Sequence, residues 1–303
     1  MCGSACPPEL VLIGHVGFAT DRMRNGTVTY TGGSGFATAF AATALLDGVG
    51  LVAQVGDDFD LGILGHLPIA MEGIAVLPGA TARLFIDQSR DGNLLFSSDL
   101  GVAAEPRFDL FPASYRQAKY VHLGTAPPRQ QLAWLKFLRG MGCRAQISVD
   151  MFEPFVQEEA DICHETCGQV NLIFLNEMEY RSLYREPSRL PAPTILKLGA
   201  DGAEFLADSA WYPVQSPPVD EVDPVGAGEI LAGSFLALRV QGLAVEQALA
   251  YSVPVAARSV TEFGVTGPSV TCELQRVREE LSKRQTRRLR TAPGTSPAAA
   301  PTA

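Results

Sequence analysis

From Tyr120 onward, β-prone runs alternate with helix-like ones: YVHL (120–123), QQLAWLKFLRGM (130–141), AQISV (145–149), EEADICHETC (158–167), LIFL (172–175), EMEYRSLY (177–184) and TILKL (194–198). Strands that alternate with helices along a chain are typical of βαβ units. In such units the strands form a parallel sheet that is covered by helices on both faces. We therefore predict an α/β fold with a doubly wound, mostly parallel sheet flanked by helices.

The chain before residue 120 has a different pattern. ELVLI (9–13) predicts a first buried strand, TVTY (27–30) a more exposed one, and VGLVAQV (49–55) a third. An alanine-rich run without Gly or Pro predicts a closely packed helix over 36–46. Residues 82–87 and 93–98 predict a hairpin that turns through Arg90-Asp91-Gly92. We expect segments 15–34 and 80–100 to form a small β-lid over the edge of the α/β domain.

The C-terminal third predicts three helices, over 227–240, over 245–263 with an interruption at Pro254, and over 272–290. The last of these ends in a basic run, and the chain beyond it consists mainly of Pro, Ala, Thr, Gly and Ser. A segment of that composition cannot bury enough apolar surface to fold. We therefore expect one domain over 8–283, followed by a basic end and a disordered tail over 284–303.

Composition restricts the function classes. The chain has 303 residues, 47% hydrophobic and 19% charged, with a formal net charge of -9. An acidic surface repels phosphate backbones, so nucleic acid is not an expected partner. No apolar run approaches the roughly 20 residues that a membrane-spanning helix needs. The first ten residues lack the basic start and apolar stretch of a signal peptide. We expect a protein of the cytoplasm without a membrane partner.

The segment DPVGAGEILAGSF (223–235) carries the clearest chemical signal. It is a glycine-rich turn that opens directly into a helix. Gly226 and Gly228 allow backbone N–H groups to point inward, and the helix N-terminus adds partial positive charge, so the turn can bind a phosphate group. Glu229, in the first helical turn, could accept a proton from a hydroxyl beside that phosphate. The plainer alternative is a helix cap followed by a first-turn acid.

Four further motifs accompany this segment in the order typical of one family. They are GGSG (32–35) before the alanine-rich helix, VGDDF (55–59), NEME (176–179) and KLGADG (197–202). Together with DPVGAGE they resemble the signatures of the PfkB, or ribokinase-like, carbohydrate kinases, and the resemblance covers roughly residues 10–280. A Rossmann dehydrogenase is a weaker alternative, because GHVG (14–17) does not supply the G-x-G-x-x-G fingerprint.

The resemblance implies a kinase that transfers the γ-phosphate of ATP to a hydroxyl of a sugar, cyclitol or nucleoside, with Mg²⁺ as cofactor. It implies that Gly226, Ala227 and Gly228 form the anion hole, with Glu229 at the position of the catalytic base. Asn176 and Glu179 would organise Mg²⁺, largely through water. The remaining residues that it assigns are Lys197, Gly199 and Gly202 near the nucleotide phosphates, Gly264 near the adenine, and Asp21, Gly32 and Gly33 at the acceptor. A requirement for a monovalent cation stays open.

Several of these residues have plainer interpretations. Asn176 could be only a helix N-cap, and Glu179 a solvent-exposed acid. Asp21 could be a loop acid, because its spacing from Gly14 is longer than usual. Lys197 could be an ordinary strand residue. A set of three aromatic residues near the lid could either stack on a base or only pack, namely Phe36, Phe85 and Phe96.

Two positions depart from the family pattern. Glu229 stands where the family has aspartate, and Ala37 where it has an asparagine that commonly helps to hold a sugar. A glutamate has a similar intrinsic pKa but is one methylene longer, which changes the reach of the base. A catalytically weak or inactive nucleotide-binding homologue with a regulatory or binding role is therefore the alternative function. The sequence leaves open both the acceptor and the choice between monomer and homodimer.

Overall fold

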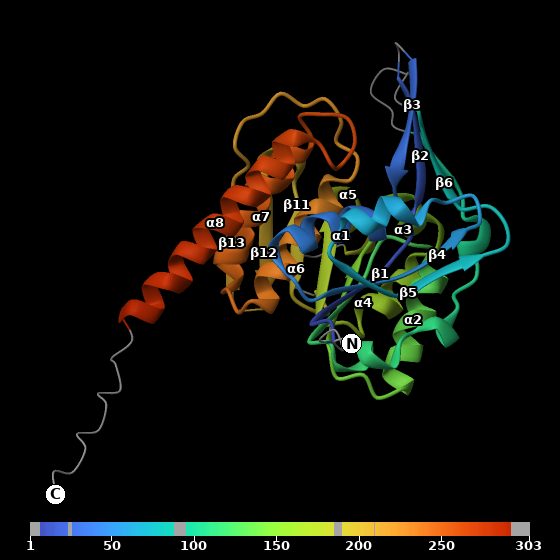
Figure 1. Cartoon of the computed structure of the whole chain (residues 1–303), viewed down its shortest axis with the longest axis horizontal. Coiled ribbons are helices and arrows are strands. Elements are labelled where there is room, and N and C mark those ends of the chain that lie inside the picture. Colours follow the sequence, from blue (N-terminus) through green and yellow to red (C-terminus); the bar gives the residue numbers. More distant parts are fainter. Residues whose placement is uncertain (1–6, 24–25, 88–94, 185–189, 209, 292–303) are drawn as a thin grey trace, which may run out of the picture.

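The computed structural model describes residues 7–23, 26–87, 95–184, 190–208 and 210–291. Within these residues the chain forms a nine-stranded sheet and a separate four-stranded sheet (Figure 1). The order of the large sheet is β13-β12-β11-β10-β9-β8-β1-β4-β5. Its strands are β1 (Leu10–Ile13), β4 (Val49–Gly56), β5 (Ile69–Leu77), β8 (Tyr120–Leu123), β9 (Gln146–Asp150), β10 (Leu172–Asn176), β11 (Thr194–Lys197), β12 (Ala203–Ala207) and β13 (Ala210–Val214).

Neighbouring strands from β11 to β5 run parallel, whereas β12 and β13 form an antiparallel edge. The chain first winds from β1 to β4 and β5, and later winds the other way through β8, β9, β10 and β11. This confirms the predicted doubly wound, mostly parallel α/β sheet. The sequence interpretation does not include β12 and β13; Ala and Glu weaken the strand signal of β12, and Pro213 interrupts the otherwise β-prone run of β13.

Helices cover both faces of this sheet, and each face has its own hydrophobic core. One face is covered by α1 (Ser34–Leu45), α6 (Ala227–Val240), α7 (Val245–Ser259) and α8 (Pro268–Thr291). The other is covered by α2 (Pro128–Gly140), α3 (Glu153–Glu158), α4 (Ala160–Cys167) and α5 (Glu177–Leu183). Short 3-10 helices occupy Leu61–His66, Gly101–Ala103, Phe108–Leu110, Ala113–Gln117 and Gly199–Asp201.

Several predicted helix boundaries are wrong, among them the start of the last helix, expected at Cys272 and found at Pro268. The helix expected over 158–167 begins at Ala160 as α4, because the chain leaves helical geometry at Glu159, and the preceding α3 is not predicted. The helix expected over 245–263 ends at Ser259. Beyond it the carbonyl oxygen of Val260 accepts hydrogen bonds from the backbone N–H groups of Val222 and Asp223 at 2.7 and 3.1 Å. Those bonds tie the end of α7 to the loop that leads into α6.

The smaller sheet has the order β3-β2-β6-β7. Its strands are β2 (Gly17–Met23), β3 (Gly26–Gly32), β6 (Ala82–Asp87) and β7 (Leu95–Asp99), so they lie within segments 15–34 and 80–100. In Figure 1, β2, β3 and β6 stand above the carboxyl ends of the large sheet. The turn expected at Arg90-Asp91-Gly92 and the tail over 292–303 lie outside the described residues.

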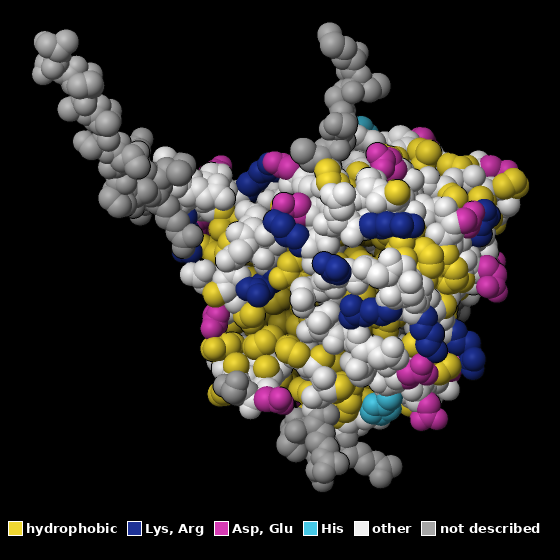
Figure 2. Space-filling model, turned by 90° about the horizontal axis from the view of Figure 1, so that it is seen from below, with side chains coloured by type: hydrophobic (Ala, Val, Ile, Leu, Met, Phe, Trp, Pro, Cys, Tyr) yellow, Lys and Arg dark blue, Asp and Glu magenta, His cyan; other side chains and the backbone are white. Residues whose placement is uncertain are grey.

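Charges are dispersed on the surface that Figure 2 shows. Basic side chains are scattered singly over that face, with acidic side chains among and around them. That face therefore carries no continuous basic stripe of the kind that binds nucleic acid. Across the described part of the chain, no helix is both long and apolar enough to cross a membrane.

The alanine-rich α1 packs closely on α6, as its composition predicts. A Cβ atom at Gly233 of α6 would lie 2.3 Å from the carbonyl oxygen of Thr38 in α1, so only glycine allows this approach. We expect Gly233→Ala to lower the free energy of unfolding by about 1–3 kcal/mol through overpacking. The matched control is Gly140→Ala, at the end of α2, where a Cβ would meet nothing within 4 Å.

Urea unfolding of the two variants tests this close approach. Because alanine is a better helix former than glycine, Gly140→Ala should leave the protein as stable as the wild type or slightly more so. Equal midpoints for the two variants would show that the packing of α1 on α6 tolerates an extra methyl group.

Candidate active site

A cavity of about 800 Å³ lies where the carboxyl ends of the parallel strands meet the smaller sheet. Doubly wound sheets bind ligands at this edge, near the point where the winding reverses. Eleven of the thirteen predicted site residues line the cavity, namely Gly32, Gly33, Asn176, Glu179, Lys197, Gly199, Gly202, Gly226, Ala227, Gly228 and Glu229. Asp21 and Gly264 are not among the lining residues.

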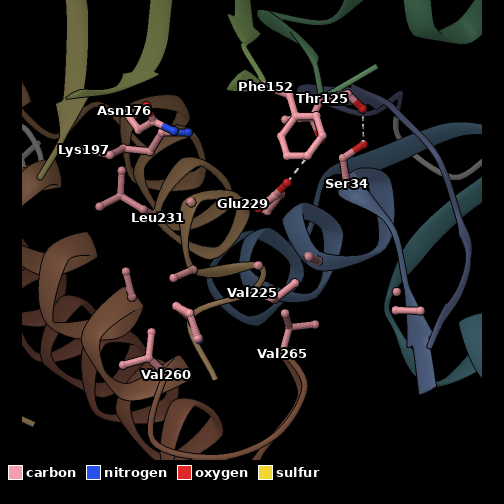
Figure 3. A pocket seen from close by; sticks show the side chains of 18 of the residues that line it. Ser34, Thr125, Phe152, Asn176, Lys197, Val225, Glu229, Leu231, Val260 and Val265 are labelled. Atoms are coloured by element: carbon pink, nitrogen blue, oxygen red, sulfur yellow. Dashed lines mark hydrogen bonds between the residues drawn. The ribbon is translucent and has the colours of Figure 1, made fainter. Parts of the chain in front are cut away.

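The N-terminus of α6 points into this cavity (Figure 3). Gly226 is the N-cap residue with φ of 85°, a left-handed conformation that glycine adopts without a steric penalty. A Cβ there would also lie 2.2 Å from Cγ1 of Val265. The N–H groups of the first helical turn have no acceptor inside the helix, so they are available to an anion.

Lys197 brings a positive charge to the same place. It is the last residue of β11, and its Nζ lies 3.1 Å from where a Cβ of Gly228 would be. Its Nζ donates a hydrogen bond of 2.6 Å to Oδ1 of Asp150, and the two side chains are 16% and 1% exposed. Burial alone would lower the pKa of Lys197, but the carboxylates of Asp150, Glu179 and Glu229 raise it. Lys197 is therefore a fixed cation beside the helix N-terminus.

Asp150 is a residue that the sequence interpretation misses; it does not itself line the cavity but holds Lys197, which does. It ends β9, directly after the predicted strand over 145–149. Burial raises its pKa to about 6, against the opposing effect of Lys197, so it is ionised at neutral pH. The available signal was its place at the carboxyl end of a parallel strand, where ligands bind in this class of fold. Its partner Lys197 lies 47 positions away, and only the folded chain reveals the pair.

Asn176 and Glu179 form a capping box at the start of α5. The backbone N–H of Glu179 donates to Oδ1 of Asn176 at 2.8 Å, and the backbone N–H of Asn176 donates to Oε2 of Glu179 at 2.7 Å. Asn176 is therefore the N-cap of α5, and it also lines the cavity. The solvent-exposed interpretation of Glu179 is wrong, because this residue is 2% exposed and burial raises its pKa to about 7.

Glu229 lies between the two ends of the cavity. Figure 3 shows its side chain with Asn176 and Lys197 on one side and Phe152, Thr125 and Ser34 on the other. The hydroxyl of Thr125 donates to Oε1 of Glu229 at 3.2 Å. Thr125 follows β8 and is a second residue that the sequence interpretation misses. Its hydrogen bond holds the Glu229 carboxylate toward the end that contains Phe152.

That end is aromatic. Phe96, Phe152 and Phe155 line it, with ring centroids 5.3 Å apart for Phe96–Phe152 and 5.4 Å for Phe152–Phe155, both edge to face. Of the aromatic residues named from the sequence, Phe96 lines the cavity, whereas Phe36 packs in the core and Phe85 is 44% exposed. The aromatic end is therefore built partly from Phe152 and Phe155, which the sequence interpretation does not single out.

Asp21 does not itself line the cavity, but it lies close to Tyr30, which does: burial, Asp223 and Asp21 together raise the pKa of Tyr30. Gly17, Ala19 and Asp21 share one face of β2, since side chains alternate along a strand. Gly17 and Ala19 line the cavity, but Asp21 lies one step further along the strand and is fully buried. The expectation that Asp21 faces an acceptor therefore has no support in this geometry.

The opposite end of the cavity is a slot of small apolar side chains. Five of them are Val225, Val253, Ala257, Val260 and Val265, and the turn with Gly199 and Gly202 lies nearby. Gly264 does not line this slot. Its backbone N–H donates to Oδ2 of Asp223 at 3.1 Å, which links the loop after α7 to the loop before α6. Gly264 therefore lies outside the lining of the slot and helps to hold the loops that form it in place.

Carboxylate oxygens around Lys197, from Asp150 and Glu179, suit a hard cation such as Mg²⁺. Oδ2 of Asp150 is buried and accepts no hydrogen bond from the described residues. In the described ranges, however, no three His, Cys, Asp or Glu side chains are grouped as a metal site requires. The site therefore fits an ion that keeps several waters and binds mainly to substrate phosphates, as Mg²⁺ does.

The fold and this site define a class of protein: α/β enzymes that hold an anionic group at a helix N-terminus beside a carboxylate. The chain belongs to the pfkB family of carbohydrate kinases, whose model matches residues 12–272. It is a phosphotransferase whose acceptor is a hydroxyl group, and its fold is ribokinase-like.

Comparison with known proteins gives relatives with different acceptors. The chain is 28% identical over 275 residues to a cytidine kinase of Thermococcus kodakarensis, covering 84% of this chain and 97% of the relative. It is 27% identical over 235 residues to an ATP-dependent ribose-1-phosphate kinase of Halopiger xanaduensis, covering 73% and 77%. A solved nucleoside kinase of Burkholderia thailandensis, in complex with inosine, has a TM-score of 0.75 at 15% identity, covering 89% and 98%.

Proposed function

We propose that this protein is a Mg·ATP-dependent nucleoside kinase. The observation that carries the acceptor class is the aromatic end of the cavity beside Glu229. Phe96, Phe152 and Phe155 offer ring faces and edges to a flat heterocycle, and base–aromatic stacking contributes about 1–3 kcal/mol per base. A free sugar would instead need many hydrogen-bonding partners. The cytidine kinase relative, which aligns over nearly its whole length, supports the same class.

The smaller sheet gives a second argument against a free sugar. Its residues on the cavity side include Ala19, Ala82 and Leu84, and no carboxylate among its described residues lines the cavity. A sugar phosphate is also disfavoured. Arg83, the cation that this sheet brings to the cavity, is already ion-paired with Asp58 at 2.9 Å. We infer that the sheet acts as a lid over the acceptor.

The proposed reaction is an in-line transfer. The acceptor hydroxyl oxygen forms a bond to the γ-phosphorus of ATP, the bond from that phosphorus to the β,γ-bridging oxygen breaks, and ADP leaves. The hydroxyl proton passes to Glu229. The N–H groups at the start of α6 and the ammonium of Lys197 stabilise charge on the transferred group. Mg²⁺, organised by Asn176 and Glu179, would neutralise charge on the phosphates.

In this arrangement the slot with Val225, Val260 and Val265 holds the adenine. The turn containing Gly199 and Gly202 then lies near the phosphates, as the motif resemblance implies. Phosphoryl transfer depends on positioning and charge stabilisation more than on covalent chemistry by the protein. Glu229, though longer than aspartate, is held by Thr125 at the boundary between the two ends, where a base is needed.

The test is ADP formation from Mg·ATP by the purified protein with a panel of acceptors. The panel contains cytidine, uridine, adenosine, inosine, ribose, fructose, myo-inositol and ribose 1-phosphate. We expect ADP formation with at least one nucleoside, at a kcat/KM at least about tenfold above that of any free sugar or sugar phosphate, since stacking contributes that much binding energy.

Two other results would each contradict one part of this proposal. A preference for ribose, inositol or ribose 1-phosphate would keep the kinase and reject the nucleoside. No ADP formation with any acceptor, together with a melting temperature that Mg·ATP raises, would identify a nucleotide-binding homologue that has lost the chemistry.

A further inference from the structure

His15 lies at the junction of the two sheets. It follows β1 of the large sheet and precedes β2 of the smaller one, and it lines the cavity. None of the sequence motifs includes it in a functional role. Its backbone lies against Gly33 and Ser34 in the wall of this cavity. Its side chain is hydrogen-bonded to Gln130, which lines a smaller cavity that His15 also lines, so the orientation of the ring is specific.

Gln130 determines which nitrogen of His15 carries the proton. The amide Nε2 of Gln130 donates to the carbonyl oxygens of Ala103 and Ala104 at 3.2 and 2.7 Å. The amide oxygen must therefore face the other way, where it lies 3.3 Å from Nε2 of His15. An amide oxygen only accepts hydrogen bonds, so Nε2 of His15 is the donor. The remaining nitrogen, Nδ1, then has a free lone pair.

The imidazole is neutral under ordinary conditions. Burial lowers the pKa of His15, and the hydrogen bond with Gln130 opposes that effect only in part. A neutral imidazole with its proton on Nε2 is an acceptor at Nδ1. No hydrogen bond from a described residue to Nδ1 is present, and Nδ1 is not among the fully buried atoms without a partner. It is thus an accessible acceptor in a residue that lines the cavity.

A short chain of hydrogen bonds connects His15 with the proposed base. The backbone N–H of His15 donates to Oγ of Ser34 at 3.4 Å, and Ser34 donates to the carbonyl oxygen of Thr125 at 2.9 Å. Thr125 in turn donates to Glu229. His15 therefore belongs to the same wall that positions Glu229, on the acceptor side of the cavity.

Acceptor hydroxyls need hydrogen-bond acceptors, and the smaller sheet supplies no carboxylate for them. We propose that Nδ1 of His15 accepts a hydrogen bond from a sugar hydroxyl of the acceptor other than the one that is phosphorylated. This inference rests on the proposed kinase function and deepens it, since it assigns a residue that determines acceptor specificity. Gln130 is the positioning residue, because it fixes the imidazole tautomer.

Two substitutions to amide side chains distinguish a hydrogen bond accepted by Nδ1 from a purely structural role of His15. In His15→Asn the amide can place an oxygen near the position of Nδ1, whereas in His15→Gln the amide reaches the position of Nε2 and leaves Nδ1 unreplaced. We expect His15→Gln to raise the KM for cytidine about tenfold or more, the effect of one lost hydrogen bond to an otherwise unpaired group. His15→Asn should stay within about threefold of the wild type, and the KM for ATP should change less than twofold in both.

Deoxynucleosides identify the hydroxyl. With the wild type, either 2′-deoxycytidine or 3′-deoxycytidine should show the same loss as His15→Gln shows with cytidine. That deoxynucleoside should suffer no further loss in His15→Gln, because the partner is already gone. Additive losses with both deoxynucleosides, or equal effects of the two His15 variants, would overturn the assignment and leave His15 as a packing residue.

A failure of the nucleoside proposal can be distinguished from a failure of the His15 assignment. If the wild type prefers a free sugar or an inositol, the nucleoside class fails. The same two variants are then compared on that acceptor, and the inference stands if only His15→Gln raises its KM. Melting temperatures of both variants within a few degrees of the wild type exclude unfolding as the cause.

Discussion

Glu229→Gln should reduce kcat by about 10²- to 10⁴-fold, the usual contribution of a positioned general base. The amide has nearly the same shape as the carboxylate but cannot accept the proton of the acceptor hydroxyl. The hydrogen bond from Thr125 can be kept, because a glutamine oxygen also accepts. Binding of Mg·ATP, measured by isothermal titration calorimetry, should therefore change by less than about threefold.

Because residue 229 is a glutamate, the effect of side-chain length on catalysis can also be tested. In Glu229→Asp the carboxylate is retained but withdrawn by one methylene from the position where Thr125 holds it. We expect a kcat between those of the wild type and Glu229→Gln, because misplacement of a base costs less than its removal. Wild-type turnover in Glu229→Gln would show that Glu229 is only a first-turn acid of α6, the plainer of the two sequence interpretations.

Lys197→Met should lower kcat by about 10²- to 10³-fold, the effect of removing one preorganised group that stabilises transition-state charge. It should also weaken binding of a non-hydrolysable ATP analogue more than binding of ADP. The physical reason is position: Nζ of Lys197 lies over the first turn of α6, where the γ-phosphate would bind. A purely structural lysine would alter the affinity for both nucleotides equally.

Loss of Lys197 also leaves Asp150 buried without its ion-pair partner, and this alone destabilises the protein. The double variant Lys197→Met/Asp150→Asn removes that unpaired charge. We expect it to regain most of the lost thermal stability while its kcat stays low. The matched control is Lys119→Met, which breaks an exposed ion pair with Glu9 at 2.9 Å and should leave turnover unchanged. Recovery of kcat in the double variant would make Lys197 a structural residue.

Local patterns in the sequence carry much of the fold and part of the site. The alternation after Tyr120 predicts the parallel sheet, because strand and helix periods are properties of adjacent residues. The glycine-rich turn before α6 predicts the anion hole for the same reason: left-handed backbone and a helix N-terminus are local features. The two antiparallel edge strands, with their weak β-composition, show where this local signal fails.

Contacts between residues far apart in the sequence could not be predicted from such local patterns. The N-cap role of Asn176 was expected because it precedes a helix, and its capping box with Glu179, three positions on, appears in the structure. The burial of Glu179 is not visible there, because it depends on what the rest of the chain places around α5. The burial of Asp21 in β2 is hidden in the sequence for the same reason, because it depends on the residues that the folded chain places around that strand.

The sequence by itself therefore determined the α/β class, the glycine-rich turn at the start of α6 and the family to which the chain belongs. Only the tertiary structure decided that Lys197 pairs with Asp150, 47 positions away, and that His15 meets Gln130, 115 positions away. Lys197 and Asp150 end the strands β11 and β9, whereas His15 follows β1 and Gln130 lies in α2. The order of strands in the sheet decides which of these segments are neighbours. That order is set by the packing of the whole chain, so no local stretch of sequence contains it.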